Sequence, residues 1–235
     1  MRRDDPRRND PAQYEELADQ WWEPSGGFAM LHWLAESRAE HIPPAAGPGA
    51  LLVDLACGAG LMAPHAARLG YRHVGVDLGA RGLQLAREHG VGVVRGSVLA
   101  VPLVDGCADV VVAGEILEHV EDDVAVLAEA ARLLRPGGVL VIDAIARTRL
   151  AELIAVRIFE RIPGGPPPGI HDPALFVDRR RLLAAADRLG LELRLVGLRP
   201  SVRDVVAWRR GRRRTVRMRP LPITAVLFAG YGHKR

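Results

Sequence analysis

The stretch Val53-Asp54-Leu55-Ala56-Cys57-Gly58-Ala59-Gly60 decides the fold, because it joins a short apolar run to a turn of small residues. The apolar residues at 50–55 predict a buried strand, and helical spacing over 61–69 predicts a helix directly after the turn. Small residues in the turn let the backbone approach a ligand closely. Doubly wound α/β folds bind their cofactors at this place, the carboxyl end of a central strand.

The turn by itself is weak evidence for the kind of ligand. A dinucleotide fingerprint, Gly-x-Gly-x-x-Gly, needs a third glycine where this chain has Ala63 followed by Pro64. A single glycine-rich turn therefore does not identify the cofactor.

On both sides of the turn, apolar strands alternate with amphipathic helices. Strands are predicted at 50–55, 73–77, 92–94, 108–113, 139–144, 191–198 and 223–229, and helices at 11–22, 28–41, 61–69, 80–88, 122–134, 150–161 and 178–189. Such alternation is typical of a parallel sheet covered on both faces. We therefore expect an α/β fold with a doubly wound, seven-stranded, mostly parallel, Rossmann-like sheet and an N-terminal helical extension.

Composition shifts divide the chain into parts. Residues 1–10 predict a flexible charged arm, and 11–49 predict helices and a linker that could cover cofactor and substrate. The linker ends in the proline-rich stretch 42–49, which cannot be helical. The main domain is expected at 50–235, with a basic insertion at 199–222.

Bulk composition excludes several classes of protein. A hydrophobic content of 49% with 26% charged residues argues against disorder. Cys57 and Cys107 lie far apart, which argues against a disulfide scaffold or a zinc site and favours a reducing compartment. Neither a long uncharged apolar run nor a signal-peptide core is present in the sequence, so a cytoplasmic location is predicted.

The second predicted strand ends in Gly75-Val76-Asp77, about 20 positions after the turn. A carboxylate at this place suits hydrogen bonding to the hydroxyls of a ribose. Asp77 could instead begin the helix that follows, as an N-cap. Both interpretations stay open on the sequence alone.

Three further motifs follow the glycine-rich turn and Asp77 along the chain. Gly96-Ser97, the run 109–112 and the segment 134–138 resemble, in this order, the successive motifs of class I S-adenosylmethionine methyltransferases. The resemblance narrows further at Leu17-Ala18-Asp19-Gln20-Trp21-Trp22 with Phe28 and Leu31-His32, at 76–79 with 83–87, at Glu115–Val120, and at Gly169-Ile170-His171-Asp172 with Phe176. Over about residues 14–198 these segments resemble the ubiquinone-biosynthesis O-methyltransferases, which act on polyprenyl catechols.

The resemblance implies a set of S-adenosylmethionine-binding residues. Arg38 would contact the cofactor's carboxylate, Asp77 its ribose, and Ser97 and Val98 its adenine. The full predicted set is Arg38, Asp54, Ala56, Gly58, Gly60, Asp77, Leu78, Ser97, Val98 and Gly114. Two positions depart from the family's pattern, because Ala56 stands where the family has glycine and Gly114 where it has methionine.

The chemistry is predicted to reside in Glu115, Glu118 and His119. Methyl transfer to a phenol requires positioning of donor and acceptor and the loss of a proton, by a base or beside a metal. On a helical turn the i, i+3, i+4 spacing places these side chains on one face, where they could hold Mg²⁺. In the resembled family this E-x-x-E-H set is the divalent-metal site.

Other interpretations of these and neighbouring residues stay open. Many small-molecule methyltransferases carry Leu-Glu-His-Val here without a metal, so His119 could line the pocket or act as the base, or the segment could be structural. His171-Asp172 could close over substrate or cap a turn. Trp21 and Trp22 could pack or form a lid, and Cys57 is expected to pack in the turn.

The net charge of +4 is concentrated in one late segment. Arg199–Arg219 holds nine arginines against Asp204 alone, about +8 in total, and Trp208 is its one aromatic residue. It could be a solvated loop or a contact for anionic lipid, which would place the protein peripherally at a membrane. A nucleic-acid footprint is less favoured, because there is little to stack on bases.

Taken together, the sequence predicts an S-adenosylmethionine-dependent methyltransferase. The expected acceptor is the hydroxyl of a catechol or phenol, such as a quinone precursor. Transfer to oxygen, nitrogen or carbon of a natural product is the alternative within enzymes, and a basic nucleic-acid-binding module is the alternative outside them.

Overall fold

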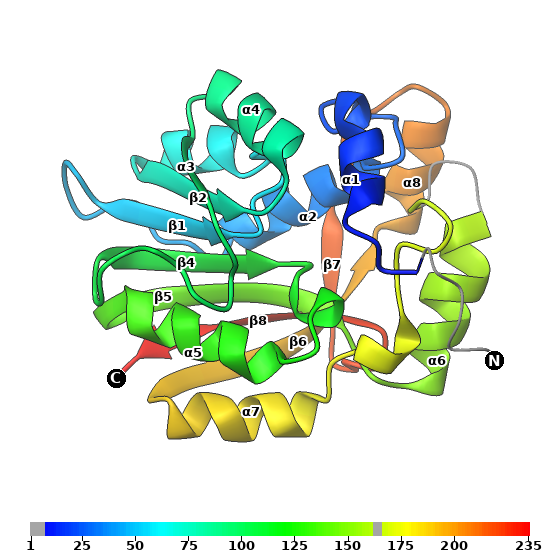
Figure 1. Cartoon of the computed structure of the whole chain (residues 1–235). Coiled ribbons are helices and arrows are strands. Elements are labelled where there is room, and N and C mark those ends of the chain that lie inside the picture. The colour runs from blue at the N-terminus through cyan, green and yellow to red at the C-terminus, as the bar shows by residue number, and fades with distance from the viewer. Residues whose placement is uncertain (1–7, 162–165) are drawn as a thin grey trace.

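The central sheet has eight strands in the order β3-β2-β1-β4-β5-β8-β6-β7 in the computed structural model, which describes residues 8–161 and 166–235 (Figure 1). The strands are β1 Leu51–Leu55, β2 Arg72–Asp77, β3 Gly92–Arg95, β4 Ala108–Gly114, β5 Leu134–Ile145, β6 Leu191–Pro200, β7 Met218–Leu221 and β8 Leu227–Lys234. The first five are parallel, and β8 inserts antiparallel between β5 and β6. The predicted doubly wound α/β fold is confirmed.

Helices cover both faces of this sheet. The α-helices are α1 Ala12–Glu16, α2 Ala29–Ala39, α3 Ala63–Leu69, α4 Ala80–Glu88, α5 Asp123–Leu133, α6 Arg149–Ala151, α7 Arg179–Arg188 and α8 Val202–Arg209. The helical turns are η1 Ala18–Gln20, η2 Leu117–His119, the π-helical η3 Glu152–Ile158, η4 Phe159–Arg161 and η5 Pro173–Leu175. Helices α5 and α7 pack on one face, and α2 and α3 on the other.

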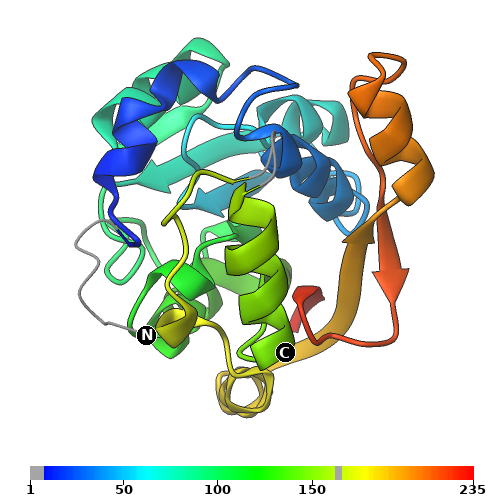
Figure 2. The same ribbon diagram turned by 90° about the vertical axis from the view of Figure 1, so that its right-hand side faces the viewer.

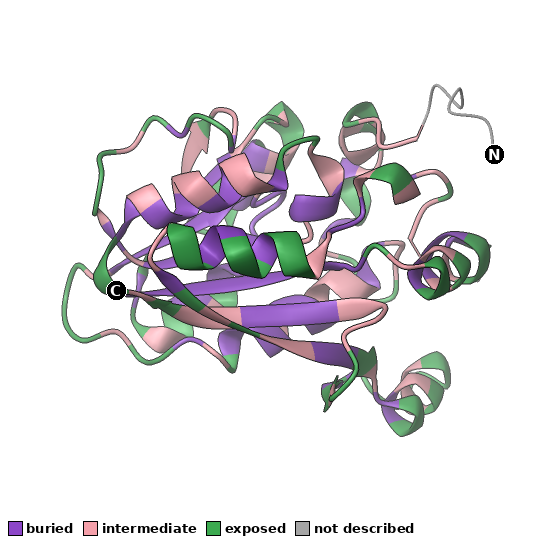
Figure 3. Ribbon diagram, turned by 90° about the horizontal axis from the view of Figure 1, so that it is seen from below, coloured by how far each residue is buried: buried purple, intermediate pink, exposed green. Residues whose placement is uncertain are grey.

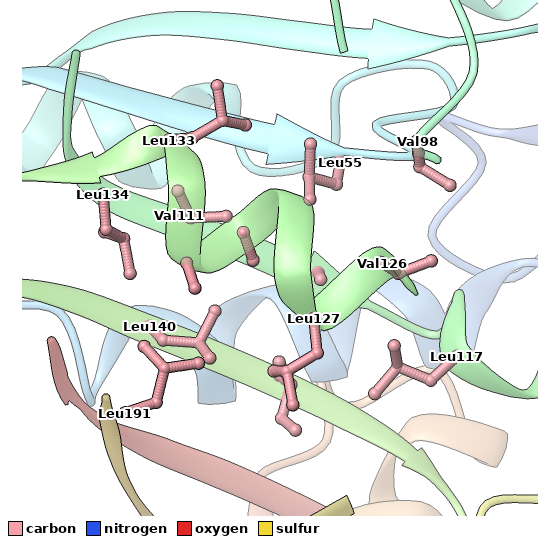
Figure 4. Close-up of a cluster of buried hydrophobic side chains, with 14 of the residues drawn as sticks. Leu55, Val98, Val111, Leu117, Val126, Leu127, Leu133, Leu134, Leu140 and Leu191 are labelled. Carbon is pink, nitrogen blue, oxygen red and sulfur yellow. The ribbon is translucent and has the colours of Figure 1, made fainter. Parts of the chain in front are cut away.

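Burial explains why the central strands are rich in apolar residues. Every residue of β1 is buried, because both faces of the sheet are covered. Figure 4 shows Leu127 of α5 and Leu140 of β5 within the larger core cluster. In Figure 3 the strands are largely buried, whereas the outer faces of the helices are exposed. This packing fixes the strand ends that carry the site.

The eighth strand corrects the predicted count of seven. The strand predicted at 223–229 is wrong in its bounds, because β8 begins at Leu227 and runs to Lys234. A separate strand, β7, pairs antiparallel with β6 at the edge of the sheet. Pro220 within β7 is tolerated because an edge strand leaves one side of its backbone unpaired.

Two helical segments also differ from the sequence prediction. Residues 11–22 form α1 and η1 as separate short pieces rather than one helix. Within the predicted basic insertion the structure has a helix, α8, which stands at the outer edge of the molecule beside β6 and β7 (Figure 2). Ser201 begins this helix by accepting a hydrogen bond from the Asp204 amide.

Residues 1–7 of the predicted arm lie outside the described residues, but Arg8 and Asn9 hydrogen-bond to His171 and His119. None of the helices described in 8–161 and 166–235 is both long and apolar enough to span a lipid bilayer.

Candidate functional site

A cavity of about 620 Å³ lies at the carboxyl ends of β1, β2 and β4. Its volume is in the range that holds a small-molecule ligand or cofactor. One part is lined by the predicted cofactor residues, namely Arg38, Asp54, Ala56, Gly58, Asp77, Leu78, Ser97, Val98 and Gly114. The other part is lined by residues from the N-terminal segment, η2 and the 166–171 loop, among them Asn9, Tyr14, Phe28, His119 and His171. The cavity thus brings most of the predicted cofactor residues together with Glu115 and His119, but Gly60 and Glu118 are not among its lining residues.

The glycine-rich turn has the backbone that its sequence indicates. Ala56 and Gly58 have φ of 57° and 51°, in the left-handed region that favours glycine. Ala56 therefore carries strain at the position where the resembled family has glycine. Gly60, also at positive φ, is not among the cavity's lining residues, and a Cβ there would meet Ala86 and Val91.

Both tryptophans of the N-terminal segment hold this turn. A Cβ on Gly58 would lie 2.4 Å from the Trp21 ring, so Trp21 packs directly on the turn and lines the cavity. The Trp22 indole donates a hydrogen bond to the Ala59 carbonyl at 3.1 Å. The N-terminal segment therefore covers the cofactor end of the cavity.

Asp77 lines the cavity and binds two backbone amides, but it is not the N-cap of α4, which is Gly79. Its Oδ2 accepts a hydrogen bond from the Gly58 amide at 2.8 Å, and its Oδ1 accepts one from the Gly79 amide at 2.7 Å, at the start of α4. Burial raises the pKa of this carboxyl above its ordinary value, although those hydrogen bonds act in the opposite direction. Since each carboxylate oxygen has a second lone pair, a ribose contact stays a prediction compatible with these bonds.

Arg38 lies in a buried ion pair beside the cavity. Its Nε donates to Asp143 Oδ2 at 2.5 Å and its Nη2 donates to Asp143 Oδ1 at 2.9 Å. A Cβ on Gly114 would lie 2.1 Å from the guanidinium carbon, so only glycine lets Arg38 occupy this position. Arg38 is among the residues that line the cavity, and its contact with a cofactor carboxylate stays a prediction.

The predicted metal ligands are not arranged as the sequence spacing suggested. Glu115 has φ of 51° at the end of β4, and η2 is a 3₁₀ turn, so the three side chains do not share an α-helical face. Glu118 is fully buried, its Oε1 accepts a hydrogen bond from the Ile145 amide, and it is not among the lining residues. Over residues 8–161 and 166–235, no three histidine, cysteine or acidic side chains gather in a group that could hold a metal. The residues therefore do not fit Mg²⁺ as they lie.

Burial explains the state of the two glutamates. Glu115 Oε1 and Glu118 Oε2 are buried without a hydrogen-bond partner. Burial raises the pKa of Glu118 to about 8, and burial with repulsion from Glu118 raises that of Glu115. Protonation therefore accounts for two carboxyls lying together beside Asp143.

His119 has hydrogen-bond neighbours at both ring nitrogens. Its Nδ1 lies 2.6 Å from Asn9 Oδ1, and the Asn9 amide nitrogen donates to the His119 carbonyl at 3.0 Å. An amide oxygen only accepts, so Nδ1 carries the proton and Nε2 faces the Tyr14 hydroxyl at 3.3 Å. Burial and the neighbouring His171 lower the pKa of His119 to about 3. The ring is therefore neutral near pH 7.

A second histidine shares this end of the cavity. The His171 ring lies over the His119 ring with centroids 5.6 Å apart, and its Nδ1 is 3.1 Å from Glu160 Oε1. Asp172, by contrast, accepts a hydrogen bond from the Ala174 amide and begins η5, which is the capping role left open by the sequence.

Sequence reasoning did not single out Asn9, Tyr14, Asp143 and Glu160. Each acts through a partner distant in the chain, such as His119 for Tyr14 and Arg38 for Asp143. The segment Gly169-Ile170-His171-Asp172, which the sequence did single out, contains the partners of Glu160, namely Gly169 and His171.

Part of the charge of the Arg-rich segment is paired. Asp204 accepts from Arg213 Nη1 at 2.6 Å and from Arg217 Nε at 2.9 Å, and these bonds lower its pKa. The Trp208 indole donates to the Pro24 carbonyl and packs edge-on against Trp33. Trp208 is thus engaged in packing rather than presented for base stacking.

Comparison with known proteins gives matches in both sequence and structure. A family described as "Methyltransferase domain" matches residues 53–142. Ubiquinone biosynthesis O-methyltransferase from Cupriavidus pinatubonensis is 36% identical over 197 residues, covering 80% of this chain and 78% of that protein. The protein of the same name from Klebsiella pneumoniae subsp. pneumoniae is 34% identical over 201 residues, covering 80% and 81%.

Solved structures share the fold at low sequence identity. A Thermotoga maritima protein, described as an S-adenosylmethionine-dependent methyltransferase and possible histamine N-methyltransferase, superposes with a TM-score of 0.65 and 19% identity over 94% of this chain and 98% of that one. A geranyl diphosphate methyltransferase in complex with GPP and sinefungin superposes with a TM-score of 0.60 and 20% identity, over 86% of this chain and 78% of that one.

Proposed function

The chain belongs to the ubiquinone-biosynthesis O-methyltransferase family of S-adenosylmethionine-dependent methyltransferases, and from that membership we propose that it methylates a phenolic hydroxyl of a catechol-type quinone precursor. The observation that carries the proposal is one cavity that is lined both by the glycine-rich turn with Asp77 and by the two histidines His119 and His171. Such a cavity can hold donor and acceptor side by side.

The predicted residues at the turn suit S-adenosylmethionine. Gly58 and Gly114 let Trp21 and Arg38 pack closely at the cavity, and Asp77, Ser97 and Val98 are among its lining residues. When bound, S-adenosylmethionine supplies a methyl group on a positively charged sulfur. We assign Asp77 to the ribose, Ser97 and Val98 to the adenine, and Arg38 to the carboxylate.

The acceptor end suits an aromatic ring with an apolar substituent. Phe28, Met30, Leu31, Ile116 and Ile170 are among the residues that line the cavity, and apolar walls favour such a molecule. His119, with Nδ1–H held by Asn9, keeps Nε2 as a hydrogen-bond acceptor beside Tyr14. We propose that His119 orients Tyr14 and the acceptor ring. Mg²⁺ is left out of this proposal because Glu115, Glu118 and His119 do not gather as ligands.

The direct test is transfer of labelled methyl from S-adenosylmethionine to catechol, to a prenylated catechol and to a simple amine. We expect methyl ethers of both catechols, with the prenylated one preferred, in the presence or absence of a chelator. Methylation of the amine alone would replace this proposal with an N-methyltransferase activity on the same fold.

We also propose that the Arg-rich segment contacts anionic lipid, where a lipophilic acceptor would reside. Val202 and Val206 of α8 are exposed at 69% and 42%, and arginines surround them in the sequence. Exposed apolar side chains bordered by cations suit a membrane surface of negative charge.

A further inference from the structure

Glu160 is a buried carboxylate that the function proposed above does not use. It is 5% exposed, and its Oε2 accepts a hydrogen bond from the Gly169 amide at 2.9 Å. Its Oε1 lies 3.3 Å from the His171 amide nitrogen and 3.1 Å from His171 Nδ1. Arg8 Nη1 stands 3.9 Å from Oε2. A buried carboxylate with these partners holds the 169–171 backbone and the imidazole together.

This contact fixes which nitrogen of His171 carries the proton. An ionised carboxylate only accepts hydrogen bonds, so Nδ1 of His171 is the N–H. Its Nε2 then keeps a free lone pair. Within the part of the chain that the structure describes, Nε2 has no hydrogen-bond partner, and His171 lines the cavity.

The neighbouring His119 is less suited to take a proton. Its Nε2 already faces the Tyr14 hydroxyl, and its Nδ1 contacts a neutral amide rather than a carboxylate. Burial and His171 also lower the pKa of His119 to about 3. A carboxylate behind an imidazole stabilises the imidazolium that forms when the ring takes a proton, and of His119 and His171 it is His171 that has this support.

We propose that His171 is the general base of the methyl transfer and that Glu160 is its positioning residue; the assignment rests on the proposed function. The acceptor O–H bond breaks and its proton passes to His171 Nε2. The oxygen's electron pair forms the new bond to the methyl carbon as the carbon–sulfur bond breaks, and that bond's electrons stay on sulfur. The products are the methyl ether and S-adenosylhomocysteine, and the imidazolium then releases its proton to solvent.

The test compares two acceptors that differ in how readily they lose a proton. Catechol needs a base at neutral pH, whereas 4-nitrocatechol is largely ionised there. We expect His171→Gln to lower kcat with catechol by about 10²–10⁴-fold, the usual contribution of a general base, and to lower it far less with 4-nitrocatechol. The affinity for S-adenosylmethionine, measured by calorimetry, should stay within twofold of wild type.

Glu160→Gln keeps the shape of the side chain but removes the charge behind the imidazole. Its kcat with catechol should fall less than that of His171→Gln, and the acidic limb of its pH profile should move to lower pH. The groups that face His171 are Glu160, Arg8 and His119. Because the acidic limb of the pH profile is assigned to His171, it must remain in His119→Asn. Asp172→Asn, a neighbour that caps η5, is the matched control and should behave as wild type.

Equal losses with the two acceptors would overturn the assignment of His171 while leaving the proposed function in place. Full activity of His171→Gln with catechol would do the same. A wild-type protein that methylates neither acceptor would overturn both proposals.

Discussion

Single residues at the cofactor end carry several contacts at once. Asp77 illustrates this, since its two oxygens hold the Gly58 turn and the start of α4 while it faces the cavity. The sequence predicted the residue and its neighbourhood, because the turn and the strand end are local patterns. It did not predict the Arg38–Asp143 and Glu160–His171 pairs, since pattern and spacing do not reveal which distant side chains meet.

We expect Asp77→Ala to weaken S-adenosylmethionine binding by about 1.5–3 kcal/mol, the range for a hydrogen bond to a charged group. Calorimetry with the unmodified cofactor measures the change. Asp77→Asn, which keeps one acceptor oxygen for the turn, separates loss of the ribose contact from loss of the turn's support. Unchanged affinity in Asp77→Ala would remove the ribose assignment.

A second residue-scale prediction concerns Gly114. A Cβ there would lie 2.1 Å from the Arg38 guanidinium carbon, so Gly114→Ala must displace Arg38 from Asp143. Breaking a buried ion pair costs about 3–5 kcal/mol when one partner is left unpaired. We expect a lower Tm and weaker S-adenosylmethionine binding. Gly92→Ala, also in a strand but with only 3.4 Å contacts around its Cβ, is the matched control. An unaltered Tm in Gly114→Ala would show that Arg38 has another place to lie.

At the scale of elements, the alternation of apolar strands and amphipathic helices was sufficient to predict the central strands of the sheet and the helices that pack on them. The edge strand β7 and the helix α8 were not predicted, because arginine-rich sequence hides the periodicity on which such predictions rest. Helix α1 contacts α4 (Figure 2), and Trp21 and Trp22, which follow η1, contact the glycine-rich turn. Glu15 of α1 accepts a hydrogen bond from the Arg81 amide, and this contact joins the N-terminal segment to α4.

For the Arg-rich segment we expect salt-sensitive binding to anionic vesicles. Arg210, Arg212 and Arg214 are exposed, whereas Arg213 pairs with Asp204 and should be kept. Replacing the first three with glutamine should reduce co-sedimentation with phosphatidylglycerol vesicles while activity on soluble catechol is retained. The matched control replaces Arg68, Arg87 and Arg188, which are exposed elsewhere, with glutamine. Equal losses in the two triple variants would indicate a general charge effect and refute a specific lipid contact.

At the scale of the whole molecule, stability should depend on pH through the buried glutamates. Glu118 has its pKa raised to about 8 by burial, whereas an unfolded glutamate titrates near 4.5. Folding therefore favours the protonated form, so this stabilising contribution is complete below pH 4.5 and is lost as the pH rises through 8. Glu118→Gln does not titrate and can still accept the hydrogen bond from the Ile145 amide. The pKa shift of Glu118 corresponds to a change in the free energy of unfolding on the order of a few kcal/mol.

We therefore expect the Tm of Glu118→Gln to match wild type at pH 4.5–5 and to exceed it by several degrees at pH 8.5. The measurement is a thermal scan across this range, repeated with a chelator and with added Mg²⁺. A bound cation would stabilise the folded state by mass action, so wild type would gain Tm with Mg²⁺ and Glu118→Gln would lose that gain. Because Glu115, Glu118 and His119 do not gather as ligands, we expect no such gain in either protein. A Mg²⁺-dependent rise confined to wild type would instead show that the two glutamates rearrange around the ion, and would restore the metal site that the sequence spacing suggested.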